Sequence, residues 1–390
     1  MAIIKSILDT DFYKLTMQNA VLKLYPRAEA KFKFFNRGNT KFPEGFGERL
    51  KEEINSMSRL VLTAEEKNFL NIKCGRYLDP AYFDYLSGYR FDPNEVQINF
   101  EKGNLDIEIK GLWYKTIMWE IPLLALISEL YFEMTGSKPL SESELTKINR
   151  EKIEIYDKLD INLAEFGTRR RYSLANHHKV IQDYIKHGND TMVGSSNVYM
   201  AMKYNLTPIG THAHEWFMFH AAKYGFHQAN KEALEAWVRV YRGDLGIALS
   251  DTFTTDAFFE SFDVFFAKLF DGVRHDSGDP LTFADKVINH YKKMNIDPLS
   301  KTIVFSDGLN PEEIIKITRY CRGRIKFSFG VGTNCTNDVG IKPLNIVIKM
   351  TEAKPYQQDW IPCIKLSDSE GKHTGNEKMI DLAKQVLNIK

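Results

Sequence analysis

Two histidines and a carboxylate stand together in the segment Thr211-His212-Ala213-His214-Glu215, directly after an apolar run at residues 206–210. Alternate side chains of an extended segment share a face, so His212 and His214 could point the same way. A His-x-His pair at the end of a strand can hold Zn²⁺ or another divalent ion for hydrolysis, with His275 and an aspartate as further ligands. A metal-dependent barrel hydrolase is therefore one hypothesis for this chain.

Anion-binding groups favour a different chemistry. The loop Gly330-x-Gly332-Thr333 offers backbone N–H groups and a hydroxyl, and such loops cradle phosphate. Arg169, Arg170 and Arg171 offer guanidinium forks for a diphosphate or a carboxylate, although three consecutive arginines cannot all face one cavity. Metal-dependent hydrolysis gives neither feature a task, so we favour an enzyme that binds phosphate groups.

Aspartates follow two of the later apolar runs. Asp276 and Asp279 belong to the segment His275-Asp276-Ser277-Gly278-Asp279, and Asp307 belongs to Ser306-Asp307-Gly308. These carboxylates could hold Mg²⁺ or bind ribose hydroxyls. Because Asp279 precedes a proline, it could instead cap a helix.

The polar clusters lie at the ends of apolar runs that we expect to be strands. From about residue 155, such runs alternate with helical stretches, among them residues 255–269, 281–294 and 311–321. The predicted strands are residues 161–166, 206–210, 245–250, 270–274, 302–305, 325–329 and 344–348. Apolar strands separated by helices are typical of a buried parallel sheet, and about seven of them predict an irregular, incomplete β/α barrel. Since the carboxyl ends of parallel strands meet on one face, the clusters should converge on one cavity.

The first third of the chain has another character. It predicts helices at residues 10–24, 44–70 and 114–134, a strand at 29–35, and a hairpin of residues 95–100 and 105–110. We expect an α+β domain over residues 1–140, completed by residues 350–390, and a β/α-barrel domain over residues 141–349. The fold class is therefore α/β, with an incomplete barrel and an α+β domain.

Composition excludes several classes of protein. The 390 residues carry 52 Lys+Arg against 51 Asp+Glu, a net charge of +1, which gives no bulk attraction to nucleic acid or an anionic membrane. With 43% hydrophobic and 26% charged residues, the chain is neither disordered nor fibrous. Its 4 cysteines form no Cys-x-x-Cys pair, which indicates reduced thiols. The apolar stretch at residues 121–128 is far shorter than the ~20 residues that span a bilayer. We expect a cytoplasmic protein that binds neither membrane nor nucleic acid.

The motifs, taken in order, resemble the nicotinate phosphoribosyltransferase family over nearly the whole chain. They are Leu8-Asp9-Thr10-Asp11-Phe12-Tyr13-Lys14, Glu165-Phe166-Gly167-Thr168-Arg169-Arg170-Arg171, Gly194-Ser195-Ser196-Asn197, Gly210-Thr211-His212-Ala213-His214-Glu215-Trp216-Phe217, Arg274-His275-Asp276-Ser277-Gly278-Asp279-Pro280, Phe305-Ser306-Asp307, Ser328-Phe329-Gly330-Val331-Gly332-Thr333 and Lys342-Pro343-Leu344-Asn345-Ile346-Val347-Ile348-Lys349. The sequence differs from the family at Ser195, where a threonine is common.

This resemblance implies a type II phosphoribosyltransferase fold and a reaction of NAD biosynthesis and salvage. Nicotinate and 5-phosphoribosyl 1-diphosphate (PRPP) give nicotinate mononucleotide and diphosphate. The reaction is expected to be coupled to ATP hydrolysis through a phosphohistidine, to require Mg²⁺, and to take place at the subunit interface of a homodimer.

The resemblance also implies roles for individual residues. His214 matches the phosphorylated histidine, and Glu215 and Asp276 are expected to join it as catalytic residues. The residues expected to bind nicotinate are Tyr13, Phe166, Arg169, Thr211 and Arg274, with Tyr13 supplied by the second subunit, Phe166 stacked on the ring and Arg274 on the carboxylate. The residues expected to bind PRPP or phosphate are Arg171, Ser277, Gly278, Ser306, Asp307, Gly330, Gly332 and Thr333. Asp276 and Asp307 are the expected Mg²⁺ ligands.

Alternatives remain open at this point. A nicotinamide phosphoribosyltransferase shares the fold and much of the site, but its neutral amide would call for an acidic acceptor near the ring. The choice of His214 over His212 rests on the resemblance alone. A binding or scaffold protein would not need polar clusters at the ends of so many strands.

Overall fold

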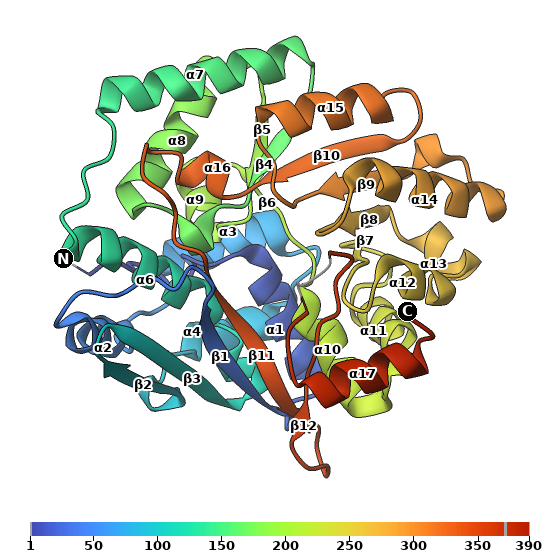
Figure 1. The fold of residues 1–390 in the computed structure, drawn as a ribbon, viewed down its shortest axis with the longest axis horizontal. Helices are drawn as coiled ribbons and strands as arrows, with labels where there is room; N and C mark the ends of the chain where they lie inside the picture. Colours follow the sequence, from blue (N-terminus) through green and yellow to red (C-terminus); the bar gives the residue numbers. More distant parts are fainter. Residues whose placement is uncertain (1, 370–372, 390) are drawn as a thin grey trace. The chain divides into compact units, whose positions relative to one another are not determined.

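A computed structural model of the chain describes residues 2–369 and 373–389. Packing divides them into two units, each assembled from segments that are distant in the sequence (Figure 1). Unit 1 comprises the residues up to Asn19 together with Phe32–Gly210 and Val331–Lys349, and unit 2 comprises Ala20–Lys31, Thr211–Gly330 and the residues from Met350 onward. These units group the chain differently from the predicted domains, residues 1–140 with 350–390 and residues 141–349. The predicted domains follow changes in the sequence pattern along the chain. The two units are instead defined by the segments that pack against one another in the folded protein.

Unit 1 contains the α+β part of the fold. Its β2 (Val96–Glu101) and β3 (Asn104–Leu112) pair antiparallel, with Ile98 opposite Ile107, and the strand order there is β1-β3-β2. The turn between them uses Lys102 and Gly103, both with positive φ, which confirms the predicted hairpin. The predicted helix at residues 44–70 is two helices, because Thr63 and Glu66 form a capping box that starts a new one.

The other elements of unit 1 have these bounds. Its helices are α1 (Phe12–Leu24, up to Asn19 in this unit), α2 (Phe46–Met57), α3 (Ala64–Cys74), α4 (Pro80–Gly88), α5 (Trp113–Thr116), α6 (Glu120–Met134), α7 (Glu142–Lys158), α8 (Leu174–His187), α9 (Val198–Lys203) and α16 (Thr333–Thr336), with short 3₁₀ turns η1 (Pro93–Glu95) and η2 (Thr168–Arg170). Its remaining strands are β1 (Glu29–Asn36, from Phe32 onward), β4 (Leu163–Glu165), β5 (Met192–Ser195) and β6 (Thr207–Pro208). The last three are parallel, in the order β6-β5-β4.

Unit 2 contains the regular strand–helix repeat. Its parallel strands are β7 (Ile247–Leu249), β8 (Gly272–His275), β9 (Thr302–Phe305) and β10 (Lys326–Val331, up to Gly330 in this unit), in the order β10-β9-β8-β7. Its helices are α10 (His214–Tyr224), α11 (Phe226–Tyr241), α12 (Thr255–Ser261), α13 (Val264–Leu269), α14 (Pro280–Lys293), α15 (Pro311–Cys321) and α17 (Glu377–Val386), with the 3₁₀ turn η3 (Pro298–Ser300). The unit also holds β11 (Ile346–Lys354, from Met350 onward) and β12 (Ile361–Pro362), which pair antiparallel.

Two strand predictions need correction. The run at residues 344–348 becomes part of β11, whose pairing with β12 is antiparallel, so it is not a barrel strand. Strand β5 was not predicted at all, because its sequence Met-Val-Gly-Ser contains no apolar run. The other six strands predicted from residue 155 onward each coincide with an observed parallel strand, and the helices between them confirm the α/β class.

Cap residues position several of the helices that follow strands. Asp279 caps α14 by accepting a hydrogen bond from the N–H of Thr282 at 2.8 Å, so the capping alternative for this aspartate is confirmed. Asn310 caps α15 in the same way, through the N–H of Glu313. Within the described ranges, no helix is both long enough and apolar enough to cross a membrane.

Candidate active site

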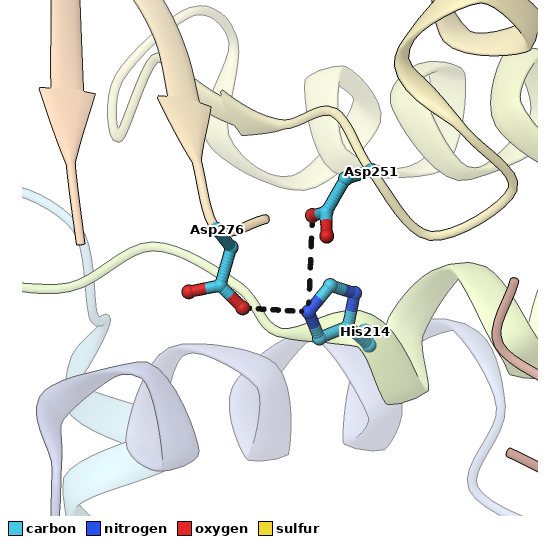
Figure 2. Close-up of side chains that lie close together, drawn as sticks. All are labelled: His214, Asp251 and Asp276. Carbon is cyan, nitrogen blue, oxygen red and sulfur yellow. Dashed lines mark hydrogen bonds and ion pairs between the residues drawn. The ribbon is translucent and has the colours of Figure 1, made fainter. Parts of the chain in front are cut away.

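His214 is the first residue of α10, a helix whose next residues, Trp216, Phe217 and Phe219, are all buried. This anchoring fixes the imidazole, which is only 9% exposed. Its Nδ1 lies 3.0 Å from the hydroxyl of Thr252, and its Nε2 lies 2.9 Å from Oδ2 of Asp276. Figure 2 shows two carboxylates facing the same ring nitrogen, with Asp251 the more distant at 3.9 Å.

A lysine from the C-terminal segment completes this cluster in unit 2. The Nζ atom of Lys365 lies 2.9 Å from Nε2 of His214 and 3.1 Å from Oδ2 of Asp251. Burial, and then the positive charge of Lys365, lower the pKa of His214 to about 4, although both aspartates oppose this. The imidazole is therefore neutral at pH 7, and one of its nitrogens carries a lone pair.

Asp276 connects the histidine to the end of β8 and to β9. Its Oδ1 lies 2.9 Å from the hydroxyl of Ser306 and 3.6 Å from Nη2 of Arg274. Burial would raise the pKa of Asp276, but Arg274 and the contact with His214 hold it well below its ordinary value. The carboxylate is thus ionised, and both of its oxygens have partners.

The three side chains of Figure 2 could in principle hold a metal ion, since their ligand atoms lie within 4.8 Å of one another. However, the ammonium of Lys365 already stands beside Nε2 of His214 and Asp251. A cation beside this ammonium would be repelled, and the lysine offers no lone pair to it. The cluster therefore does not fit a divalent metal, which removes the basis for the metal-dependent hydrolase.

The two histidines of the His-x-His pair have different environments. His212 is fully buried, and its Nε2 accepts a hydrogen bond from the N–H of Leu249 at 3.2 Å. Its ring packs 4.7 Å from that of Trp237 and 5.3 Å from that of Phe217. His275 is also buried, against Phe283. The predicted metal set of His212, His214 and His275 is therefore not assembled.

Other predicted residues of unit 2 differ in burial and in hydrogen bonding. Arg274 and Asp307 are half-buried, Glu215 and Gly330 are buried, and Thr211 donates its hydroxyl hydrogen to the carbonyl of Ile247 at 2.8 Å. Arg274 is the most informative of these, because its Nε is buried and makes no hydrogen bond within the part of the chain that the structure describes. A buried guanidinium N–H without a partner is suited to an anionic ligand.

Ser277 and Gly278 form the turn after Asp276. The hydroxyl of Ser277 donates to Oδ2 of Asp251 at 2.6 Å and accepts from the N–H of Asp368 at 3.0 Å. This side chain is buried and has both partners, so it orients Asp251 and has no free capacity for a phosphate. Gly278 has φ +83°, a backbone conformation that favours glycine.

In unit 1, the predicted residues separate into a half-buried and a buried set. Tyr13, Phe166, Arg169, Gly332 and Thr333 are half-buried. Gly167 stands where any side chain would collide with Thr336, since a Cβ would come within 2.1 Å of its hydroxyl oxygen. The chain can therefore place Phe166 and Arg169 at this turn only with a glycine between them.

Arg171 lies apart from the half-buried residues. Its side chain is 0% exposed and forms two hydrogen bonds with the carboxylate of Asp9, of 2.6 and 2.8 Å. Glu129 lies 3.7 Å from its Nε. The predicted phosphate contact would require this ion pair to open, so the structure gives Arg171 a role in the core of unit 1 instead.

Comparisons with known proteins agree with this arrangement. The profile of the nicotinate phosphoribosyltransferase (NAPRTase) family matches residues 161–390, and that of its N-terminal domain matches residues 8–128. The chain belongs to the nicotinate phosphoribosyltransferase family. It is 57% identical to the nicotinate phosphoribosyltransferase of Chromohalobacter salexigens over 382 residues, which cover 98% of both chains. It is 49% identical to that of Desulforapulum autotrophicum, over 98% of this chain and 99% of the relative.

Solved structures of nicotinate phosphoribosyltransferases have the same fold. The crystal structure of the Porphyromonas gingivalis enzyme superposes with a TM-score of 0.96 at 46% identity, covering 99% of this chain and 100% of the other. A putative nicotinate phosphoribosyltransferase from Saccharomyces cerevisiae gives a TM-score of 0.94 at 34% identity, covering 100% of this chain and 99% of that one. These matches confirm the predicted fold and family.

Three residues of the His214 cluster in this nicotinate phosphoribosyltransferase family member, Asp251, Thr252 and Lys365, were not among the site residues predicted from the sequence. Asp251 and Thr252 follow the predicted strand at residues 245–250, so they belong to the polar clusters expected to converge on the cavity, but neither received a role of its own. Lys365 has no comparable signal, because it follows no parallel strand and belongs to no motif.

Proposed function

We propose that this chain transfers the phosphoribosyl group of PRPP to nicotinate and couples the transfer to ATP hydrolysis through phosphorylation of His214. Products are nicotinate mononucleotide and diphosphate, and the reaction belongs to NAD biosynthesis. The observation that carries the coupling is the neutral imidazole of His214, fixed at the start of α10 between Thr252 and Asp276. A fixed, neutral imidazole is a nucleophile suited to accept a phosphoryl group.

The phosphoryl step needs only a lone pair on the ring. A bond forms between the imidazole nitrogen and the γ-phosphorus of ATP while the bond from that phosphorus to the ADP oxygen breaks. The electron pair of the broken bond leaves on ADP, and the ring keeps its proton on the other nitrogen. Thr252, whose hydroxyl lies 3.0 Å from Nδ1, holds the ring in place.

Recognition of nicotinate is assigned to Arg274, because its buried Nε lacks a hydrogen-bond partner within the described residues. The carboxylate of nicotinate can accept two parallel N–H hydrogen bonds from a guanidinium and neutralise its charge. The amide of nicotinamide is uncharged, so it cannot neutralise the guanidinium. The proposal therefore favours nicotinate over nicotinamide. Tyr13, Phe166, Arg169 and Thr211 keep their predicted contacts with the nicotinate ring as part of it.

The transfer itself calls for charge stabilisation rather than proton transfer. The pyridine nitrogen of nicotinate already has a lone pair, so it can attack C1 of the ribose as the diphosphate leaves. Donors held in advance of the reaction stabilise the charge that develops on the leaving group. Gly330, Gly332 and Thr333 keep their predicted phosphate contacts in this proposal. Gly278 and Ser306 do not, because the N–H of Gly278 donates to Ser369 at 3.1 Å and the hydroxyl of Ser306 donates to Asp276 at 2.9 Å.

Mg²⁺ is proposed to accompany the diphosphate of PRPP, where it would neutralise negative charge. Both oxygens of Asp276 have partners, so this residue does not fit as a ligand. Asp307 is half-buried and supplies the carboxylate oxygen that Mg²⁺ prefers, and the proposal assigns the ion to it. A cytoplasmic homodimer, with the site at the subunit interface, completes the proposal.

The test is a product assay with the purified full chain. Nicotinate or nicotinamide is incubated with Mg²⁺ and ATP, with and without PRPP, and the mononucleotides are quantified. We expect nicotinate mononucleotide, formed only with PRPP. Product from nicotinamide at an equal rate would refute the assigned specificity, and no product from either substrate would refute the transfer.

A further inference from the structure

The backbone around Lys365 holds its ammonium against His214. Lys365 forms an isolated antiparallel bridge with Thr374, through 2.9 Å hydrogen bonds in both directions. The next N–H along the chain, that of Leu366, donates to the carbonyl of Thr252 at 2.9 Å. Thr252 also contacts Nδ1 of His214, so this residue connects the backbone next to Lys365 with the histidine ring.

The side chain of Lys365 is 9% exposed, and its ammonium has two partners, Nε2 of His214 at 2.9 Å and Oδ2 of Asp251 at 3.1 Å. An ammonium is a donor only, so its bond to Nε2 requires a lone pair on that nitrogen. The proton of the neutral ring must then be on Nδ1, where the hydroxyl oxygen of Thr252 can accept it.

Asp276 competes for the same nitrogen. Its Oδ2 is also 2.9 Å from Nε2, and a carboxylate accepts only from a protonated nitrogen. The surroundings of the ring thus allow two tautomers, one that bonds Lys365 and one that bonds Asp276. Without the ammonium, the proton would move to Nε2 and the lone pair would move to Nδ1, against Thr252.

We infer that Lys365 is a positioning residue that selects the tautomer of His214 with its lone pair on Nε2, and that its ammonium supplies the cation of a His–Asp–Asp cluster that would otherwise hold a metal ion. The selection rests on the 2.9 Å contact between the ammonium and Nε2, together with the neutral state of the ring. Its consequence, that Nε2 is the nitrogen phosphorylated by ATP, rests on the proposed function.

Nitrogen NMR of the full chain, labelled with ¹⁵N in its histidine rings, tests the selection without any substrate. Protonated and unprotonated ring nitrogens resonate far apart, and the His214 signals are those absent from a His214→Gln variant. At pH 7.5 we expect an unprotonated Nε2 and a protonated Nδ1. A wild-type His214 protonated on Nε2 overturns the inference, whatever the variants do.

Lys365→Met removes the ammonium while keeping most of the side-chain volume. We expect the proton of His214 to move, so that Nε2 gives the signal of a protonated nitrogen and Nδ1 that of an unprotonated one. Labelling by [γ-³²P]ATP should fall by about tenfold or more, as for loss of one charge-assisted hydrogen bond. Lys301→Met is the matched control, because this buried lysine donates to the carbonyls of Lys268 and Phe270, away from the histidine. Its His214 signals should stay as in the wild type.

Metal binding tests independently whether the ammonium of Lys365 takes the place of a metal ion. Lys365→Ala should bind one Co²⁺ through His214, Asp251 and Asp276, seen as visible absorption bands, whereas the wild type and a Lys365→Ala/His214→Gln variant should not. Co²⁺ bound at His214 of the wild type overturns the claim that the ammonium is the cation. If the wild type has the expected tautomer but is never labelled by ATP, the coupling in the proposed function fails and the inference stands.

Discussion

Arg274 and Asp276 stand two residues apart at the end of β8, with Nη2 of the arginine 3.6 Å from Oδ1 of the aspartate. The pair serves two purposes. The arginine keeps Asp276 ionised beside His214, as the lowered pKa of the carboxyl indicates. At the same time its buried Nε is left without a partner within the described residues, which is the basis of the contact with the nicotinate carboxylate that we propose.

The first prediction concerns this guanidinium. Arg274→Lys keeps the charge but loses the planar fork, so kcat/KM for nicotinate should fall by about 10- to 100-fold. The residual rate with nicotinamide should change much less, because an amide does not use the fork. Arg319→Lys, on the exposed surface of α15, is the control. Equal losses for both substrates would show that Arg274 does not read the carboxylate.

The second prediction separates the two histidines. His212→Gln can still accept the N–H of Leu249, so it should cost about 1–3 kcal/mol of stability and leave labelling by [γ-³²P]ATP intact. His214→Gln should abolish the label while the protein remains folded. Acid-labile ³²P would be measured on both purified variants after the same incubation. A labelled His214→Gln protein would assign the phosphoryl group to another residue.

The third prediction concerns Asp11, which accepts hydrogen bonds from Thr168 and Ser196 inside unit 1. Burial raises its pKa to about 6, from an ordinary 3.8. Between these values the folded protein binds more protons than the unfolded chain, so this group lowers stability progressively as the pH rises from about 4 to 6. Asp11→Asn removes that loss and should gain about 2 kcal/mol relative to wild type between pH 4 and pH 7.

Urea unfolding midpoints of the two proteins at several pH values would measure this gain. Asp106→Asn, on the exposed face of the β2–β3 hairpin, is the matched control and should show no such trend. A difference between Asp11→Asn and wild type that stays constant with pH would show that Asp11 is ionised in the folded protein throughout this range.

The fourth prediction tests the placement of Arg171. Removing one partner of a buried ion pair leaves an uncompensated charge, so Asp9→Asn and Arg171→Met should each lose about 3–5 kcal/mol of stability. The KM for PRPP should change little in whatever protein remains folded. Unfolding midpoints and PRPP titrations of Arg171→Lys would distinguish a role in the core from a contact with phosphate. Unchanged stability with a large rise in KM would restore the predicted phosphate contact.

The sequence predicted the parts of the fold that a local pattern encodes. Six apolar runs became parallel strands, and Asn310 and Asp279 marked the starts of the helices they cap. Strand β5 was not predicted because Gly194 and Ser195 interrupt the apolar pattern. The run at residues 344–348 was placed in the wrong sheet because apolar character does not reveal which strand a segment pairs with.

The site, like the fold, was predicted only where a local sequence pattern indicates it. His214, Asp276 and Ser306 follow strands and were singled out from that position, whereas Arg274, inside β8, was identified from the family resemblance. The pattern could not distinguish Arg171 from Arg169, because the partner of Arg171 is Asp9, which lies 162 residues away in the sequence. Lys365 was missed on the same grounds, since it lies 151 residues from His214. Partners so distant are known only once the chain has folded.

Coupling through His214 is tested by the stoichiometry of ADP to nicotinate mononucleotide in wild type and His214→Gln, assayed with nicotinate, PRPP and Mg²⁺, with and without ATP. The wild type should form ADP in step with product, and ATP should accelerate product formation. His214→Gln should form product slowly, at one rate with or without ATP, and release no ADP. A His214→Gln protein that still releases ADP in step with product would show that His214 does not couple the two reactions.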